Sequence, residues 1–280
     1  MEMQMRGGIF SARRFGQILF RELAGGYRSI LIAMAAVAGT VIVLSVLTTL
    51  GISQGSGMTT AQTGGFYAGF FVQVLFLGGF IITSLAFREV QQNGAGIFYM
   101  TLPSSLLEKF VSKLLVTSVG YAVGSLVFYT IVAAAGEGIN LLIFGFGHGL
   151  FNPLELPVLR AVGIYMITQS VFLLGSIWFR KLSLVKTVLW LAIFALGVAA
   201  IAAVTARLVL ADHFVWRLAQ SGRGAWSMDL SSAYLSSRFG MGSPGYTGAM
   251  VFATIGRVMF YLLAPVCWLA GYFKLGEVEV

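Results

Sequence analysis

The sequence predicts an all-α membrane protein with six transmembrane helices, and three observations lead to this prediction. Hydrophobic residues make up 58% of the 280 residues, and the mean hydropathy is +0.89. Charged residues account for only 10%, against about 25% in a typical soluble domain. Apolar runs recur from residue 29 almost to the C-terminus, and none shows the alternation typical of an outer-membrane barrel. We therefore expect one membrane unit over residues 1–280, with no separate soluble domain.

Six runs are long enough to cross a bilayer, because a helical span needs about 20 apolar residues. They cover residues 29–50, 66–87, 111–135, 159–179, 187–210 and 248–273. If the N-terminus lies inside, the inner segments hold 12 of the 18 Lys and Arg residues and the outer side holds the remaining 6. Cytoplasmic segments of membrane proteins are enriched in these residues. We therefore expect both termini to be cytoplasmic.

The N-terminal segment 1–28 precedes the first run, and residues 9–23 predict an amphipathic helix that lies on the membrane. Apolar side chains at helical spacing share one face, and polar, mainly basic side chains cover the other: Phe15, Ile18, Leu19 and Leu23 against Arg13, Arg14, Gln17 and Arg21. Such a helix suits the headgroup boundary and would contact lipid. The alternative is a basic anchor that only fixes the topology.

Three outer loops separate the runs. Residues 51–65 are rich in Gly, Ser and Thr, and 211–247 carry aromatic side chains of the kind that favour the bilayer interface. The loop 136–158 contains the apolar stretch Ile139–Phe146, which glycines interrupt and Pro153 and Pro157 follow. This pattern predicts a re-entrant or interfacial segment rather than a span.

Several common functional sites are missing from the sequence. No G-x-x-x-x-G-K-[ST] pattern occurs, so the chain does not bind ATP through a phosphate loop. His148, His213 and Cys267 are isolated from one another, so we expect no metal site and no catalytic set in this chain. The basic residues are scattered at the ends of runs, which argues against nucleic-acid binding.

The six runs contain no Asp or Glu, although ion-coupled carriers usually place such a residue within a span. Arg257 is the notable charged residue inside a run. It is a candidate contact for an anionic or amphiphilic substrate. The favoured interpretation is a side chain whose guanidinium reaches the interface.

The inner segment 88–110 is a polar island between the second and third runs. Gly94 and Gly96 loosen the chain, and Pro103 restricts the preceding residue to an extended shape. Ser105-Leu-Leu-Glu108 matches a capping box, which predicts that a helix begins at about Ser105. These residues fit a capped start of the third span, and they fit equally well a surface element that contacts a partner.

The phrase from Tyr99 to Leu115, Tyr-Met-Thr-Leu-Pro-Ser-Ser-Leu-Leu-Glu-Lys-Phe-Val-Ser-Lys-Leu-Leu, is similar to one that follows the second span in the membrane subunits of type-2 ATP-binding-cassette (ABC) exporters. The Leu-Glu-Lys-Phe variant resembles permeases of the type found in Bacteroidetes. The six spans and the basic N-terminal helix also resemble that family. The resemblance covers the whole topology, but the motif itself covers only these 17 residues.

In that family the segment holds a coupling helix that docks on a separate cytoplasmic ATPase. The resemblance implies that this contact involves Leu102, Pro103, Ser104, Ser105, Leu106, Leu107, Glu108 and Lys109. It also implies a permease subunit that is not itself an enzyme, in a bacterial inner membrane. ATP and Mg²⁺ would bind the partner ATPase, and a second permease chain, identical or related, would complete the transporter.

The expected function is export of an amphiphilic or lipid-like substrate. The family has a re-entrant hairpin between its fifth and sixth spans, whereas the loop 211–247 at that place is more polar. Two alternatives stay open. One is a membrane scaffold or sensor that binds a cytoplasmic partner other than an ATPase, and the other is a membrane-embedded enzyme with catalytic residues from scattered loops.

Overall fold

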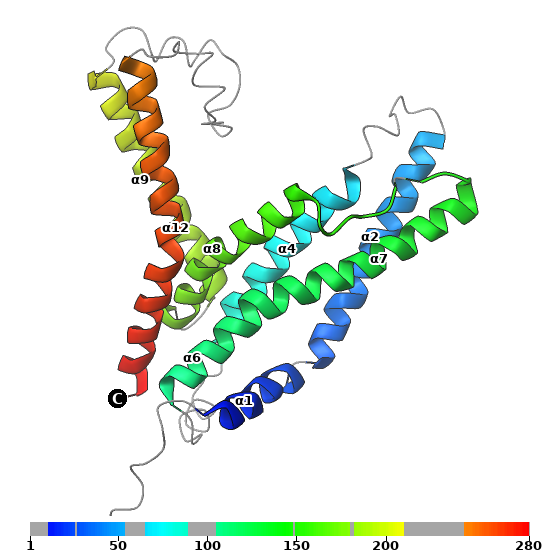
Figure 1. The fold of residues 1–280 in the computed structure, drawn as a ribbon, viewed down its shortest axis with the longest axis horizontal. Helices are drawn as coiled ribbons and strands as arrows, with labels where there is room; N and C mark the ends of the chain where they lie inside the picture. Colours follow the sequence, from blue (N-terminus) through cyan, green and yellow to red (C-terminus); the bar gives the residue numbers. More distant parts are fainter. Residues whose placement is uncertain are drawn as a thin grey trace, which may run out of the picture. The chain divides into compact units, whose positions relative to one another are not determined.

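The computed structural model describes residues 11–25, 27–53, 65–88, 105–147, 149–179, 182–209 and 244–279. Within these ranges every regular element is a helix (Figure 1). Six of the helical stretches are long and apolar enough to cross a membrane. The predicted class, an all-α membrane protein with six spans, is therefore confirmed.

The helices follow the predicted runs closely, with one exception. In chain order they are α1 (Ala12–Gly25), α2 (Tyr27–Ser53), α4 (Phe66–Leu85), α6 (Leu106–Leu115), the π-helical turn η1 (Val116–Gly120), α7 (Tyr121–Phe144), α8 (Leu156–Trp178), α9 (Ser183–Val209) and α12 (Pro244–Glu279). The exception is the third span, where α6, η1 and α7 form one continuous helical stretch of 39 residues. Most of the predicted loops 51–65, 88–110 and 211–247 lies outside the described residues.

The chain divides into two compact units. One contains the residues up to Leu184 together with those from Ala264 onward, and the other contains Val185–Leu263. The second division falls within α12, beside Pro265, whose ring removes one helical hydrogen bond. In the second unit the described side chains of α9 are mostly exposed and apolar, and Trp190 stacks on Phe194 with ring centroids 5.7 Å apart. Such an apolar exterior suits contact with lipid.

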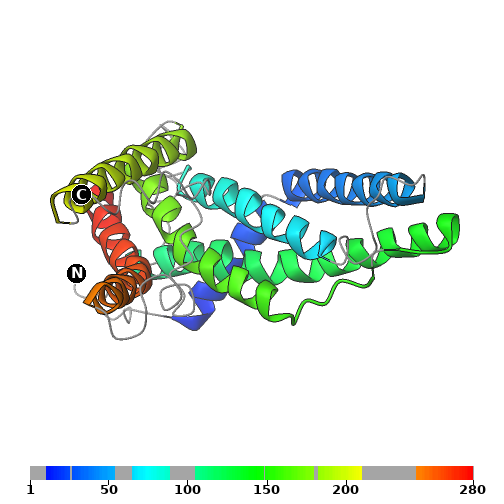
Figure 2. The same cartoon turned by 90° about the horizontal axis from the view of Figure 1, so that it is seen from above.

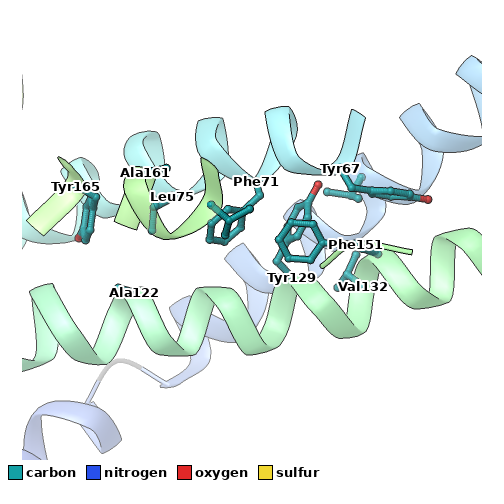
Figure 3. Packing of buried hydrophobic residues seen from close by; sticks show 12 residues of the cluster. Tyr67, Phe71, Leu75, Ala122, Tyr129, Val132, Phe151, Ala161 and Tyr165 are labelled. Atoms are coloured by element: carbon teal, nitrogen blue, oxygen red, sulfur yellow. The ribbon is translucent and has the colours of Figure 1, made fainter. Parts of the chain in front are cut away.

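In the first unit α4 packs against both α7 and α8, α2 packs against α7, and α1 packs against α6 (Figures 1 and 2). Three aromatic rings form the centre of the core, as Figure 3 shows. Phe71 of α4, Tyr129 of α7 and Phe151 have ring centroids 5.1–5.5 Å apart. Contacts of this kind hold the spans together in lipid, where burial of apolar surface gives little driving force.

The prediction of a break after residue 135 is wrong. Helix α7 continues through Ile139 to Phe144, so most of the apolar stretch assigned to a re-entrant segment is helical. Gly136 lies inside the helix, where a Cβ would lie only 3.2 Å from Ser45 Oγ of α2. The missing side chain instead lets α2 and α7 approach each other closely.

Helix α7 ends at Gly145, which has φ +73° and donates its N–H to the Leu141 carbonyl oxygen over 3.0 Å. Glycine adopts this left-handed conformation without steric cost. The chain then turns back along α7 and returns Phe151 to the aromatic core. A segment does fold back at this end, but it begins after the helix, at Gly145.

Helices α6 and α12 pack together at one end of the first unit. Phe110 of α6 lies in an apolar cluster with Leu275 of α12, and its ring centroid is 6.0 Å from that of Tyr272. We call this end, which also holds α1, the α1 end, and we call the opposite end of α7 the Glu137 end. The arrangement agrees with an even number of membrane crossings.

Candidate functional site

The start of α6 is built by the predicted capping box, which is confirmed. Ser105 has the extended conformation of an N-cap residue, with φ −70° and ψ 152°. Its hydroxyl accepts the Glu108 N–H over 3.2 Å, and Glu108 Oε2 accepts the Ser105 N–H over 3.0 Å. Two backbone donors that a helix start leaves without partners are therefore satisfied.

The other oxygen of Glu108 binds the N-terminal helix. Glu108 Oε1 accepts the Ser11 N–H over 2.6 Å and lies 3.4 Å from Arg14 Nη2. The side chain of Glu108 is fully buried, with 0% exposure, whereas that of Arg14 keeps 35%. A single carboxylate thus caps α6 and fixes the start of α1.

The surroundings of Glu108 keep its carboxyl group ionised. Burial alone raises its pKa, but the Ser11 and Ser105 amides and the Arg14 guanidinium outweigh burial and hold the pKa below its ordinary value. Glu108 lies outside the charge-free part of the third helix. The charge-free stretch between Lys113 and Glu137 has 23 residues, or about 35 Å of helix, enough to span a hydrocarbon core of about 30 Å.

A second ion pair joins α1 to α6 further along both helices. The Lys113 ammonium contacts the Glu22 carboxylate, and the two side chains are 8% and 15% exposed. Arg14 does not share the exposed face of α1, because its guanidinium lies beside Glu108 of α6. Arg13 and Arg21 are exposed, as predicted. With one ion pair near each end of α1, the two helices form one docked unit.

Helix α6 buries charged residues as well as apolar ones. Its charged residues Glu108, Lys109 and Lys113 are buried, while Leu107 and Leu115 are 36% and 38% exposed. Glu108 and Lys113 point inward, where α1 supplies their ionic partners. Phe110 is buried against α12, whereas Leu107 and Leu115 remain exposed, where lipid or another protein can cover them.

The π-helical turn η1 connects α6 to the spanning part of the third helix and is bound to two neighbours. The Tyr165 hydroxyl of α8 donates to the Thr117 carbonyl oxygen over 2.7 Å. Just after the turn, the Tyr121 hydroxyl donates to the Val74 carbonyl oxygen of α4 over 2.9 Å. Single π turns inside α-helices are frequent at functional sites. Through these two bonds, a displacement of α6 would act directly on α4 and α8.

The other candidate residues are placed as follows. Leu102, Pro103 and Ser104 lie outside the described residues. Leu106 is half-buried, and a Cβ at Gly276 of α12 would lie 3.4 Å from it. Arg257 is exposed and lies within α12, whose bounds are Pro244–Glu279.

A second polar cluster, which the sequence pattern did not indicate, lies at the Glu137 end. Glu137 lies inside α7 and is 4% exposed. Its Oε1 accepts the Gly149 N–H over 2.8 Å, and its Oε2 accepts the Tyr67 hydroxyl over 3.3 Å. The continuous third helix therefore carries a second buried carboxylate besides Glu108. The absence of Asp and Glu, which held for the predicted runs, does not hold for the observed helix.

The described residues include no group of three or more His, Cys, Asp or Glu that could hold a metal ion. Gly51-Ile-Ser53-Gln-Gly55 fits the G-x-S-x-G pattern of α/β-hydrolases. That pattern requires a turn from strand to helix, whereas Ser53 is the exposed last residue of α2 and donates to the Leu50 carbonyl oxygen. It is not a nucleophile elbow.

The fold and these two clusters define the class of the protein as a multi-pass α-helical membrane protein whose third spanning helix is joined at one end to an amphipathic helix. Comparisons of the chain with protein-family models, with curated proteins and with solved structures find no match.

Proposed function

We propose that this chain is the permease subunit of an ABC exporter, driven by ATP that a separate cytoplasmic subunit hydrolyses. The observation that carries the proposal is the docking of α1 on the capped start of α6 through buried Glu108. A transport subunit without an ATP site of its own needs a rigid element through which a partner can move its spans. The α1–α6 unit has the construction of such an element.

Movement would pass from the α1–α6 unit to the other helices of the first compact unit in three steps. A partner that closes on ATP would displace α6, and the ion pairs would carry α1 with it. The π turn would pass the displacement on through Tyr165 to α8 and through Tyr121 to α4. The equilibrium between the two arrangements would shift because ATP-bound and ATP-free partners bind them with different affinities.

The burial of each residue suggests which role it has in the proposed contact. Glu108 and Lys109 are buried inside the chain, so we assign them a positioning role. Leu107 is the exposed apolar residue of the described part of the segment, and we assign it the direct contact with the ATPase. Under this proposal a second permease chain completes the transport route, and Arg257 is a candidate contact for an amphiphilic substrate.

Purification of the full chain from its native cells tests the proposal. The tagged protein, extracted in a mild detergent, should co-elute with a phosphate-loop ATPase, and the complex should hydrolyse Mg-ATP after reconstitution into lipid. Co-elution with a cytoplasmic protein that lacks a phosphate loop would support the scaffold or sensor alternative and count against the proposal. Hydrolysis of lipid by the chain alone would support the enzyme alternative instead.

A further inference from the structure

Helix α1 turns one stripe of side chains toward α6. The stripe consists of Arg14, Ile18 and Glu22, which are four residues apart and therefore share one side of the helix. Arg14 forms an ion pair with Glu108, and Glu22 forms one with Lys113. Ile18 lies between these two pairs along the helix and is 8% exposed. Two ion pairs and one buried apolar side chain therefore fix the rotation of α1 about its own axis.

This rotation leaves a basic and aromatic face of α1 exposed. Arg13, Gln17 and Arg21 are all exposed and follow one another at the same four-residue spacing. Phe20 is 73% exposed and, at about 100° per residue, lies about 200° around the helix from Ile18. Within the part of the chain that the structure describes, neither Arg13 nor Arg21 has an ion-pair partner. We call Arg13, Gln17, Phe20 and Arg21 the outer face of α1.

Helix α1 lies at the level where the bilayer begins. It packs against η1 as well as against α6, and η1 belongs to the charge-free stretch between Lys113 and Glu137. The apolar helix α2 begins at Tyr27, two residues after α1 ends at Gly25, and Figure 1 shows α1 beside the starts of α2 and α6. The outer face is therefore placed among the headgroups of the surrounding lipid.

We propose that the outer face of α1 binds the headgroups of anionic phospholipids. Arginine holds phosphate oxygens through paired N–H donors, and the glutamine amide between the two arginines adds a further donor. An exposed aromatic ring beside basic residues suits the boundary between headgroups and acyl chains. Two arginines without acidic partners favour a lipid with net negative charge over a zwitterionic one.

An acidic protein surface is the other partner that two arginines fit. The contact of α1 with η1 favours lipid, because it keeps the outer face at the membrane boundary. Lipid bound there would hold α1 on the membrane, while the ion pairs to α6 hold it on the spans. This proposal does not depend on the export function. Its failure would leave the ATPase test untouched, and failure of that test would leave the lipid site standing.

Thermal unfolding of the purified full chain in a neutral detergent tests the proposal. Dioctanoyl-phosphatidylglycerol should raise the unfolding midpoint in a saturable way, because a ligand that binds the folded state stabilises it by mass action. Dioctanoyl-phosphatidylcholine, which has the same acyl chains, should give a much smaller rise. Sodium phosphate should give none, which separates a lipid headgroup from free phosphate. High salt should weaken the effect of phosphatidylglycerol, because it screens exposed charges.

The double variant Arg13→Gln/Arg21→Gln should bind phosphatidylglycerol about 30-fold more weakly, as read from the lipid concentration at half of the full rise. A basic residue beside an anionic lipid surface contributes a factor of about five, and two such factors multiply. Arg160→Gln is the matched control, because Arg160 is an exposed arginine in the first turns of α8. It should keep the full affinity.

Equal rises with the two lipids, or an unchanged affinity in the double variant, would overturn the proposal. If the double variant does not fold, Arg13→Gln and Arg21→Gln decide singly, and each should weaken binding about five-fold. Unchanged binding in both single variants would also overturn it. If the double variant keeps its lipid affinity but no longer co-elutes with an ATPase, the outer face contacts that protein and the proposal is wrong.

Discussion

Replacing Glu108 by Gln should undock α1 from α6. The substitution keeps the size and shape of the side chain, but it removes the charge and turns one acceptor oxygen into a donor. Whichever way the amide is oriented, either the Ser11 or the Ser105 N–H loses its acceptor. A hydrogen bond to a charged group is worth about 1.5–3 kcal/mol, and a buried donor left without a partner costs about 1–3 kcal/mol. These terms overlap, so we expect a loss of about 2–4 kcal/mol.

Amide hydrogen exchange of residues 12–25 in lipid nanodiscs measures this loss directly. Protection should fall about 30- to 900-fold, since each 1.36 kcal/mol corresponds to a factor of ten. The matched control is Glu277→Gln, which removes an exposed carboxylate, 66% accessible, at the same end of the unit. It should leave protection of α1 unchanged. Equal protection of α1 in the two variants would refute the assignment of Glu108 as the group that holds α1.

Three further predictions test the electrostatics and the packing. The pKa of Glu108 is lowered from 4.5 in the folded chain, so the stabilisation by this carboxylate should be complete above pH 4.5 and fade as the pH falls through the lowered pKa. The difference in unfolding midpoint between wild type and Glu108→Gln should therefore shrink at low pH. A difference that does not change with pH would contradict this. In α4, Gly79→Ala places a Cβ 2.2 Å from the Tyr165 ring, whereas Gly69→Ala meets nothing within 4 Å. In denaturant unfolding, Gly79→Ala should lower the free energy of unfolding by about 1–3 kcal/mol, and Gly69→Ala should not lower it. Tyr165→Phe removes the bond to the Thr117 carbonyl oxygen and should cost about 1 kcal/mol in the same assay, and no loss would argue against a role for that bond.

The sequence was most informative where structure depends on near neighbours. The capping box at Ser105 and Glu108 joins residues three positions apart, so the pattern alone predicted where the helix begins. The partners of the second Glu108 oxygen could not be predicted in this way. Ser11 and Arg14 are separated from it by 97 and 94 residues, and no periodicity within either helix indicates which side chains meet.

The error at the Glu137 end has a related cause. Gly136 and Gly138 flank the carboxylate, and glycine is a weak helix former, so local sequence favoured a loop. Packing reverses that preference, because Gly136 is the place where α7 approaches Ser45 of α2. Asn140 and Tyr67 complete the cluster from positions that the sequence does not relate to one another.

The central claim is that the α1–α6 unit receives the movement of an ATPase, and ATP turnover of the purified complex tests it most directly. Leu107→Asp changes the exposed residue of α6 to which we assign the ATPase contact. Leu142→Asp makes the same change at the Glu137 end of the same long helix, where the side chain is 88% exposed. We predict that Leu107→Asp abolishes ATPase co-elution and lipid-stimulated turnover, while Leu142→Asp preserves both. Equal turnover in the two variants, or no ATPase with the wild-type chain, would contradict the account.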